Sequence, residues 1–312
     1  MKYISAFLGD IGFDLGGVGI TNAVQATFSL AWMQEHSGIA EMCRKTSPVR
    51  KPDEAIMREG RTWLKHASGI YGKTVANVAV EVAYGAARTK FSSDMDFLCT
   101  VTGVPPEDVI MVNWTSDGTY GPAHGVLVDR KERQVVVIFR GTLTFSDLLT
   151  DMAMESTPFT CALGTGTGHI GWVSGAKRMC EKLRPVWEKA LADNPDCNLT
   201  FTGHSLGAAM AQLVAMIVGP TTEVAGRQGP VPVRAFGYGA VPVVDLAIAR
   251  KASSYVTTFL EGADTAPRTG KEGALELKAT LIKLHHDAAV RDRAQRLRSR
   301  KGVVPSAEEK RW

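Results

Sequence analysis

The sequence predicts an α/β fold in which a mostly parallel sheet carries helices on both faces, preceded by a helical N-terminal extension. Two observations predict this fold class. Short β-rich segments alternate with segments of helical periodicity along the middle of the chain, which is the pattern of successive βαβ units. Residues 134–139 (QVVVIF) form a nearly continuous β-branched run, which is typical of a strand that is buried on both faces.

The individual elements follow from apolar spacing and turn residues. Strands are expected at 125–129, 134–139, 198–201, 231–237 and 255–260, and helices at 73–90, 94–101, 174–192, 206–218 and 274–288. The charged stretch 41–62, which contains two prolines, is predicted to be a linker or an exposed loop. The glycine-rich stretch 159–169 is interpreted as an ordinary flexible connection, with a short lid as the alternative.

The chain is therefore divided into three parts. Residues 1–72 form a helical or irregular extension, 73–290 the α/β domain, and 291–312 a basic tail. Residues 1–32 are apolar, but Asp10 and Asp14 interrupt them, so we predict neither a signal peptide nor a membrane-spanning helix. Packing of this segment on the domain is favoured over a membrane-surface helix, because a cationic face is missing.

The composition excludes some partners and indicates a compartment. The formal net charge of +4 is too small to predict a nucleic-acid partner, and no zinc-finger spacing occurs. Peripheral membrane contact through the basic tail is a weaker alternative to a solvated helix end. The odd number of scattered cysteines indicates reduced thiols in a cytoplasmic protein. These cysteines are Cys43, Cys99, Cys161, Cys180 and Cys197.

The strongest chemical motif is Gly203-His204-Ser205-Leu206-Gly207, which lies between a predicted strand and a predicted apolar helix. In this context a G-x-S-x-G sequence forms a tight turn that exposes the serine hydroxyl at the carboxyl edge of the sheet. The helix N-terminus at that point carries partial positive charge, which stabilises a developing oxyanion. Ser205 is thus a candidate nucleophile, while an incidental tight turn is the bland alternative.

A second motif follows the buried strand, where Arg140-Gly141-Thr142 begins a loop at the same sheet edge. An oxyanion hole needs one amide from the residue after the nucleophile, here Leu206, and one donor from such a loop. Thr142 offers both an amide and a hydroxyl. By itself, however, this tripeptide is more often a plain turn at the end of a strand.

Four motifs in order resemble the class 3 lipase family of α/β-hydrolases. They are FRGTLTFSDLLTDM (139–152), HIGW (169–172), FTGHSLGAA (201–209) and GADTAPR (262–268). Residues 102–116 and 121–137 resemble in particular its sn-1-specific diacylglycerol lipase branch. The resemblance covers about 73–288 and implies Ser205 as nucleophile, Thr142 and Leu206 as oxyanion donors, and Asp264 as the acid of a catalytic triad.

The general base is the part of the triad that the sequence does not identify. Asp264 also fits on its position, because it follows a predicted strand and comes after the nucleophile. His285 and His286 follow Asp264, but both fall inside the predicted helix 274–288, whereas the base normally follows a further helix and strand. They are therefore weak candidates. The open alternatives are a fragment, a shortened chain or an inactive relative.

The resemblance implies a lipid ester hydrolase that acts on an acylglycerol through a serine acyl-enzyme, and the branch that it matches implies diacylglycerol as the substrate. No cofactor is expected for this mechanism, and no metal ligand is assigned. The competing hypothesis is a non-catalytic lipid-binding or interaction module that kept the fold and lost the histidine. Monoacylglycerol, triacylglycerol and phospholipid stay open as substrates, because the shape of the binding site decides among them.

Overall fold

The computed structural model describes residues 53–73, 91–117, 120–141 and 156–260. The helices are α4 (Glu54–Gly69), α6 (Asp94–Thr102), α8 (Ile170–Asp193), α9 (Leu206–Val218) and α10 (Leu246–Ala252), with a short 3-10 helix η1 (Pro106–Asp108). The strands are β1 (Val109–Asn113), β2 (His124–Asp129), β3 (Gln134–Phe139), β4 (Ser156–Cys161), β5 (Gly164–His169), β6 (Asn198–His204), β7 (Thr221–Thr222), β8 (Val231–Tyr238) and β9 (Val256–Phe259). The predicted helices 73–90 and 274–288 and the tail 291–312 lie outside the described residues.

A single large sheet has the strand order β1-β2-β3-β6-β8-β7, and β9 also pairs with β8. The strands β3, β6, β8 and β9 run parallel, whereas β1, β2 and β7 are attached in antiparallel pairs. Phe139 lies opposite Gly203, and Tyr238 lies opposite both His204 and Phe259. The four parallel strands therefore end at one common edge, which is where the predicted serine turn begins.

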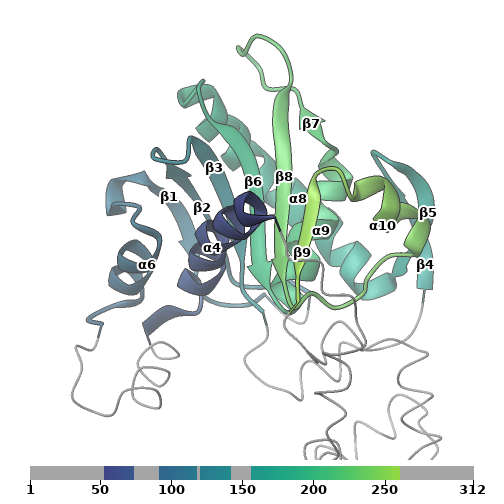
Figure 1. Cartoon of the computed structure of the whole chain (residues 1–312), viewed down its shortest axis with the longest axis horizontal. Helices are drawn as coiled ribbons and strands as arrows, with labels where there is room; N and C mark the ends of the chain where they lie inside the picture. The colour runs from purple at the N-terminus through teal and green to yellow at the C-terminus, as the bar shows by residue number, and fades with distance from the viewer. Residues whose placement is uncertain (1–52, 74–90, 118–119, 142–155, 261–312) are drawn as a thin grey trace, which may run out of the picture. The chain divides into compact units, whose positions relative to one another are not determined.

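Helices cover the two faces of the sheet (Figure 1). On one face α4 crosses the strands and lies beside α6, and on the other α8 and α9 pack against β3 and β6. Consecutive residues of β6 show the two faces: Phe201 packs edge-on against Trp187 of α8, and the Thr202 hydroxyl lies 3.3 Å from the Trp63 carbonyl of α4. The predicted α/β fold is confirmed, with a parallel centre and antiparallel margins.

Helix α4 corrects the prediction that residues 41–62 form a linker or loop, because its first nine residues, 54–62, are helical. Asp53 caps the helix by accepting a hydrogen bond from the Ala55 amide at 2.9 Å. The charged residues that suggested a loop lie mostly on the exposed side, whereas Gly60, Trp63 and Ala67 are buried. The helix is amphipathic. Its buried side contains few large apolar residues, so the sequence does not show a clear helical periodicity of apolar positions.

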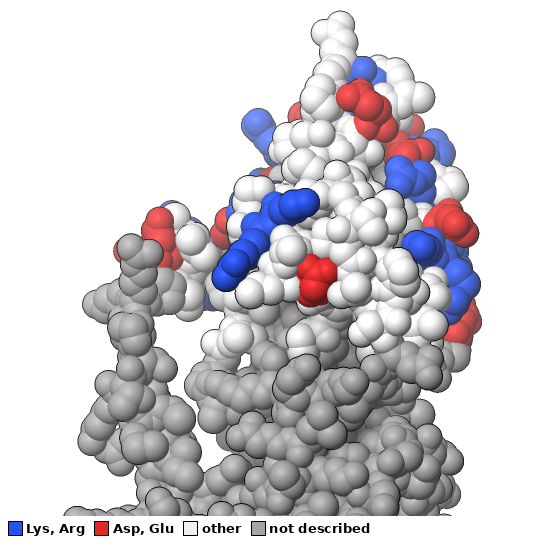
Figure 2. Space-filling view, turned by 90° about the vertical axis from the view of Figure 1, so that its right-hand side faces the viewer, with Lys and Arg blue, Asp and Glu red and all other residues white. Residues whose placement is uncertain are grey.

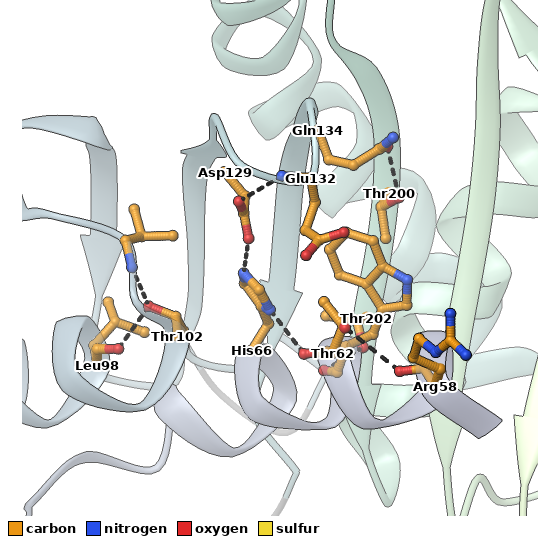
Figure 3. Close-up of polar contacts among 12 residues, drawn as sticks. Arg58, Thr62, His66, Leu98, Thr102, Asp129, Glu132, Gln134, Thr200 and Thr202 are labelled. Carbon is orange, nitrogen blue, oxygen red and sulfur yellow. Dashed lines mark hydrogen bonds and ion pairs between the residues drawn. The ribbon is translucent and has the colours of Figure 1, made fainter. Parts of the chain in front are cut away.

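Figure 3 shows how polar contacts fasten α4 to the sheet. The Nδ1 atom of His66 lies 3.1 Å from the Thr62 carbonyl oxygen, which can only accept a hydrogen bond, and its Nε2 lies 3.1 Å from Asp129 Oδ2. Both side chains are buried. Burial alone would raise the pKa of Asp129, but hydrogen bonds from His66 and from the Glu132 amide hold that pKa below its usual value.

Residues 159–169, which we predicted to be a flexible connection, belong instead to an antiparallel hairpin of β4 and β5. The prediction was wrong because the alternating glycines weaken the strand signal, and because contacts that hold the hairpin come from a distant segment. The Asp245 amide donates to the Thr167 carbonyl at 2.9 Å, and the His169 amide donates to the Val243 carbonyl at 3.0 Å. Figure 2 looks at this side of the molecule and shows acidic and basic side chains interspersed.

Candidate active site

Ser205 lies at the turn from β6 into α9, as the sequence predicts, and its backbone has an unusual conformation. Its φ is 57° and its ψ is −124°. A non-glycine residue held in such a region costs on the order of 1–3 kcal/mol, and such strain is concentrated at functional sites. The Ser205 amide donates to the Tyr238 carbonyl at 2.8 Å, so the neighbouring strand β8 holds the strained residue in place.

The two glycines of the motif are required by close backbone contacts. A β-carbon on Gly203 would clash with the backbone of Gly207 and lie 2.7 Å from the Phe139 carbonyl oxygen. A β-carbon on Gly207 would clash with the same carbonyl oxygen and lie 2.6 Å from the Arg140 carbonyl carbon. The glycines therefore allow the first turn of α9 to lie directly against the end of β3.

Leu206 is the first residue of α9, and its side chain is buried. The first amides of a helix have no carbonyl partner within that helix, and they carry its partial positive charge. The Leu206 amide is therefore one of these terminal amides of α9, and its role as an oxyanion donor stays a prediction.

The loop after β3 passes directly beside the serine. A β-carbon on Gly141 would lie 3.1 Å from the Ser205 β-carbon and 2.6 Å from the His204 carbonyl oxygen. The structure thus brings Gly141 to the serine turn, although the two are far apart in sequence. Thr142, the predicted oxyanion donor, is the next residue and lies outside the described residues.

Arg140 fixes the start of this loop. Its amide donates to the Ala123 carbonyl at 2.8 Å, and its guanidinium donates to the Trp114 carbonyl at 3.0 Å. Burial lowers the pKa of the guanidinium from its usual value. The loop therefore leaves the sheet from an anchored residue rather than from a frayed strand end.

Tyr71, which follows α4, is a site residue that the sequence did not reveal. Its hydroxyl lies 2.9 Å from His204 Nδ1 and accepts a hydrogen bond from the Gly141 amide at 3.2 Å. Burial raises the pKa of Tyr71 to about 12, so the phenol is neutral at physiological pH. The contact joins α4, the serine turn and the loop after β3. No local pattern predicts it.

Four of the histidines lie within the described residues. The His66 ring pairs with Asp129 at the opposite edge of the sheet, and the His124 ring, buried, contacts the Pro122 carbonyl at 2.7 Å. His204 contacts Tyr71, and His169 precedes α8. None of these contacts assigns a base to Ser205. Asp264, His285 and His286 lie outside the described residues.

Two negative findings apply only to the part of the chain that the structure describes. Within it, no helix is both long enough and apolar enough to cross a membrane. Within the same residues, no cluster of His, Cys, Asp or Glu side chains could hold a metal ion.

The sheet topology, the strained serine between strand and helix, and the adjacent loop define an α/β-hydrolase with a nucleophile elbow. Residues 136–272 match the family described as Lipase (class 3). The resemblance to class 3 lipases is thereby confirmed, and the match covers most of β3, the elbow and the segment that contains Asp264.

Curated relatives extend this similarity. Diacylglycerol lipase-beta of Mus musculus is 27% identical over 191 residues, which cover 59% of this chain and 27% of the relative. Diacylglycerol lipase-alpha of Homo sapiens is 30% identical over 164 residues, covering 49% of this chain and 15% of the relative. The match thus spans about a quarter or less of the length of these relatives.

Solved structures confirm the fold. A lipase from Rhizopus microsporus var. chinensis superposes with a TM-score of 0.54 at 21% identity, covering 71% of each chain. Lipase II from Rhizopus niveus gives a TM-score of 0.52 at 20% identity, covering 69% of this chain and 75% of the other. At these identities the likeness concerns the fold alone.

Proposed function

We propose that the chain hydrolyses the ester bonds of a lipid through an acyl-enzyme on Ser205. The observation that carries the proposal is the conformation of Ser205, with φ 57° and ψ −124°, at the junction of β6 and α9. Nothing would stabilise such backbone strain in an incidental tight turn. A nucleophile elbow requires the strained serine, and it also requires a second loop beside the serine that supplies an oxyanion donor.

The chemistry follows the order of acyl transfer. The Ser205 oxygen attacks the ester carbonyl while a histidine takes the serine proton. The Leu206 amide and Thr142 stabilise the tetrahedral oxyanion, and Asp264 orients the histidine. The C–O bond to the alcohol then breaks, and the alcohol leaves with the proton from the histidine. Water hydrolyses the acyl-enzyme by the same sequence of steps and regenerates Ser205.

Diacylglycerol is the substrate that we propose. The support is the identity of 27% to diacylglycerol lipase-beta and of 30% to diacylglycerol lipase-alpha. Because such a substrate resides in a bilayer, the proposal includes peripheral contact with a membrane surface. Hydrolysis of diacylglycerol, monoacylglycerol, triacylglycerol and phospholipid, each presented in mixed micelles, distinguishes the substrate classes.

A serine-directed fluorophosphonate probe tests the mechanism, because it reacts only with an activated serine. We expect the intact chain to be labelled and Ser205→Ala to be unlabelled. Ser116→Ala, which changes a serine near the same loop, is the matched control and should keep the labelling. If the intact chain releases fatty acid and Ser205→Ala releases it equally fast, the proposed mechanism is wrong.

The alternative of a non-catalytic lipid-binding module rests on the sequence: His285 and His286, which follow Asp264, both fall inside the predicted helix 274–288 instead of after a further strand. Replacing His285 and His286 separately with alanine addresses it. Loss of labelling in one variant identifies the base. Absence of labelling in the intact chain, together with retained binding to diacylglycerol-containing vesicles, supports the module instead of the enzyme.

A further inference from the structure

We propose that Tyr71 is a positioning residue, whose hydroxyl holds the oxyanion loop at its working distance from the nucleophile elbow. The inference rests on the proposed function, since it concerns how the same site stabilises an oxyanion. Its basis is one bridge: the Tyr71 oxygen lies 2.9 Å from His204 Nδ1 and 3.2 Å from the Gly141 amide nitrogen.

The direction of the Gly141 hydrogen bond follows from its groups, and the direction of the His204 hydrogen bond is part of the proposal. A backbone amide can only donate, so the Tyr71 oxygen accepts from Gly141. The phenol proton is then available for His204, whose Nδ1 accepts it. This arrangement requires that the neutral His204 ring carries its proton on Nε2 rather than on Nδ1. A neutral phenol suits the role, and burial raises the pKa of Tyr71 to about 12.

Tyr71 itself is held from both sides, so it can act as a fixed point. Its amide donates to the Ser68 carbonyl at 3.1 Å, which closes the end of α4. Two residues later, the Lys73 amide donates to the Asp94 carboxylate at 2.8 Å, which ties the segment to α6. Ile70, directly before Tyr71, is fully buried. The hydroxyl is therefore positioned by the core and not by the loop that it contacts.

The bridge also fixes the direction of the Gly141 amide at the start of the loop. The Gly141 amide points to Tyr71, so that amide is occupied. The next amide along the loop belongs to Thr142, which the sequence assigns to the oxyanion. Misplacing a catalytic group by about 1 Å can cost a hundredfold in rate, so a contact one residue away is well placed to matter.

The decisive variant is Tyr71→Phe, which removes the hydroxyl and keeps the ring. We expect kcat for ester hydrolysis to fall about tenfold, with KM within about twofold, because ground-state lipid binding does not involve the bridge. Tyr255→Phe is the matched control: among the described residues its buried hydroxyl has no hydrogen-bond partner, and Tyr255 precedes β9, whose other end lies at the elbow. Its kcat should equal that of the intact chain.

A second measurement reports the bridge without relying on turnover. In the intact chain, histidine ¹⁵N spectra should show His204 with an unprotonated Nδ1 that accepts a hydrogen bond. In Tyr71→Phe, that Nδ1 signal should shift and the Gly141 amide should exchange faster with solvent. Tyr255→Phe should change neither.

The outcomes separate the two proposals. Unchanged His204 and Gly141 signals in Tyr71→Phe overturn the bridge. Changed signals with an unchanged kcat overturn the positioning role but leave the hydrolase intact. An intact chain with neither turnover nor probe labelling overturns the proposed function, and the positioning role with it. A tenfold loss of kcat together with the changed signals supports both.

Discussion

The Nε2 atom of His66 lies 3.1 Å from the Asp129 carboxylate, at the sheet edge opposite Ser205. The pair joins α4 to the end of β2, and it is buried on both sides. It is a part of the structure that stability measurements can isolate, because it is remote from the candidate site.

Removing the charge of Asp129 should destabilise the protein. For Asp129→Asn we expect a loss of about 2 kcal/mol in the free energy of unfolding at neutral pH, measured by urea denaturation. Asp193→Asn, which removes an exposed partner of Lys189, should cost less than about 0.5 kcal/mol. Equal losses in the two variants would contradict the structural role of the buried pair.

The same pair predicts a pH dependence with a definite sign. The folded pKa of Asp129 is lower than its usual value of 3.8. Its contribution to stability is therefore fully present above that value and is lost as the pH falls through the lower, folded pKa. The difference in unfolding free energy between the intact chain and Asp129→Asn should shrink below pH 3.8. A difference that stays constant throughout acid titration would rule out this account.

Gly141→Ala should impair the candidate site more than the fold. The added methyl group would lie 2.6 Å from both the His204 carbonyl oxygen and the Tyr71 hydroxyl, so the loop must move. We expect kcat to fall about a hundredfold. Gly226→Ala is the control: nothing lies within 4 Å of its added carbon, and its φ of +82° leaves only a strain of about 1 kcal/mol. If Gly141→Ala keeps the kcat of the intact chain, the loop accommodates the added methyl group without disturbing the site.

Thr142→Ala tests the oxyanion donor that the sequence assigns. Loss of a side-chain donor to an oxyanion costs about a hundredfold in kcat, and KM should change little. Thr142→Ser, which keeps the hydroxyl, should recover most of the activity. Thr144→Ala, in the same segment, should have none of this effect. If Thr142→Ala matches the intact chain, the hydroxyl has no catalytic part.

Asp245 should control the stability of the β4–β5 hairpin. Its carboxylate accepts hydrogen bonds from the Ile248 amide at 2.9 Å and from Thr167, and these bonds lower its pKa. In Asp245→Ala the amides of Thr167 and Ile248 should exchange faster with solvent, as mass spectrometry or NMR would show. Asp245→Asn should exchange at an intermediate rate, since its amide oxygen can still accept. Unchanged exchange in Asp245→Ala would mean that the strand contacts alone hold the hairpin.

The elements predicted well from the sequence are those whose signal is local. Helix α9 runs over Leu206–Val218, the predicted range, because an apolar run follows a motif that dictates a turn. Strand β3 coincides with the predicted range 134–139, because a run of β-branched residues strongly favours a strand that is buried on both faces. The serine turn belongs to the same group, since its glycines are demanded by contacts that any such turn must make.

The features that the sequence did not reveal depend on distant partners. Helix α4 was not predicted because the charged residues of its exposed side suggested a loop. The N-cap residue Asp53 alone is a weak indication of a helix start. The hairpin depends on the segment 243–245, far along the chain. Tyr71 contacts His204 across a sequence separation of 133 residues, so no window of sequence contains both. Asp264 and the two histidines that follow it stay predictions.

Helix α4 has a practical consequence for anyone who shortens the chain. The boundary drawn from sequence would start the hydrolase part at Lys73, and that start would remove both α4 and Tyr71. Such a version would lose Trp63, which packs on Phe236 in the core, together with the phenol beside the elbow. A shortened version of the chain must therefore begin before Asp53. The helix that starts there covers part of one face of the sheet, and its C-terminal end leads to Tyr71 at the candidate site.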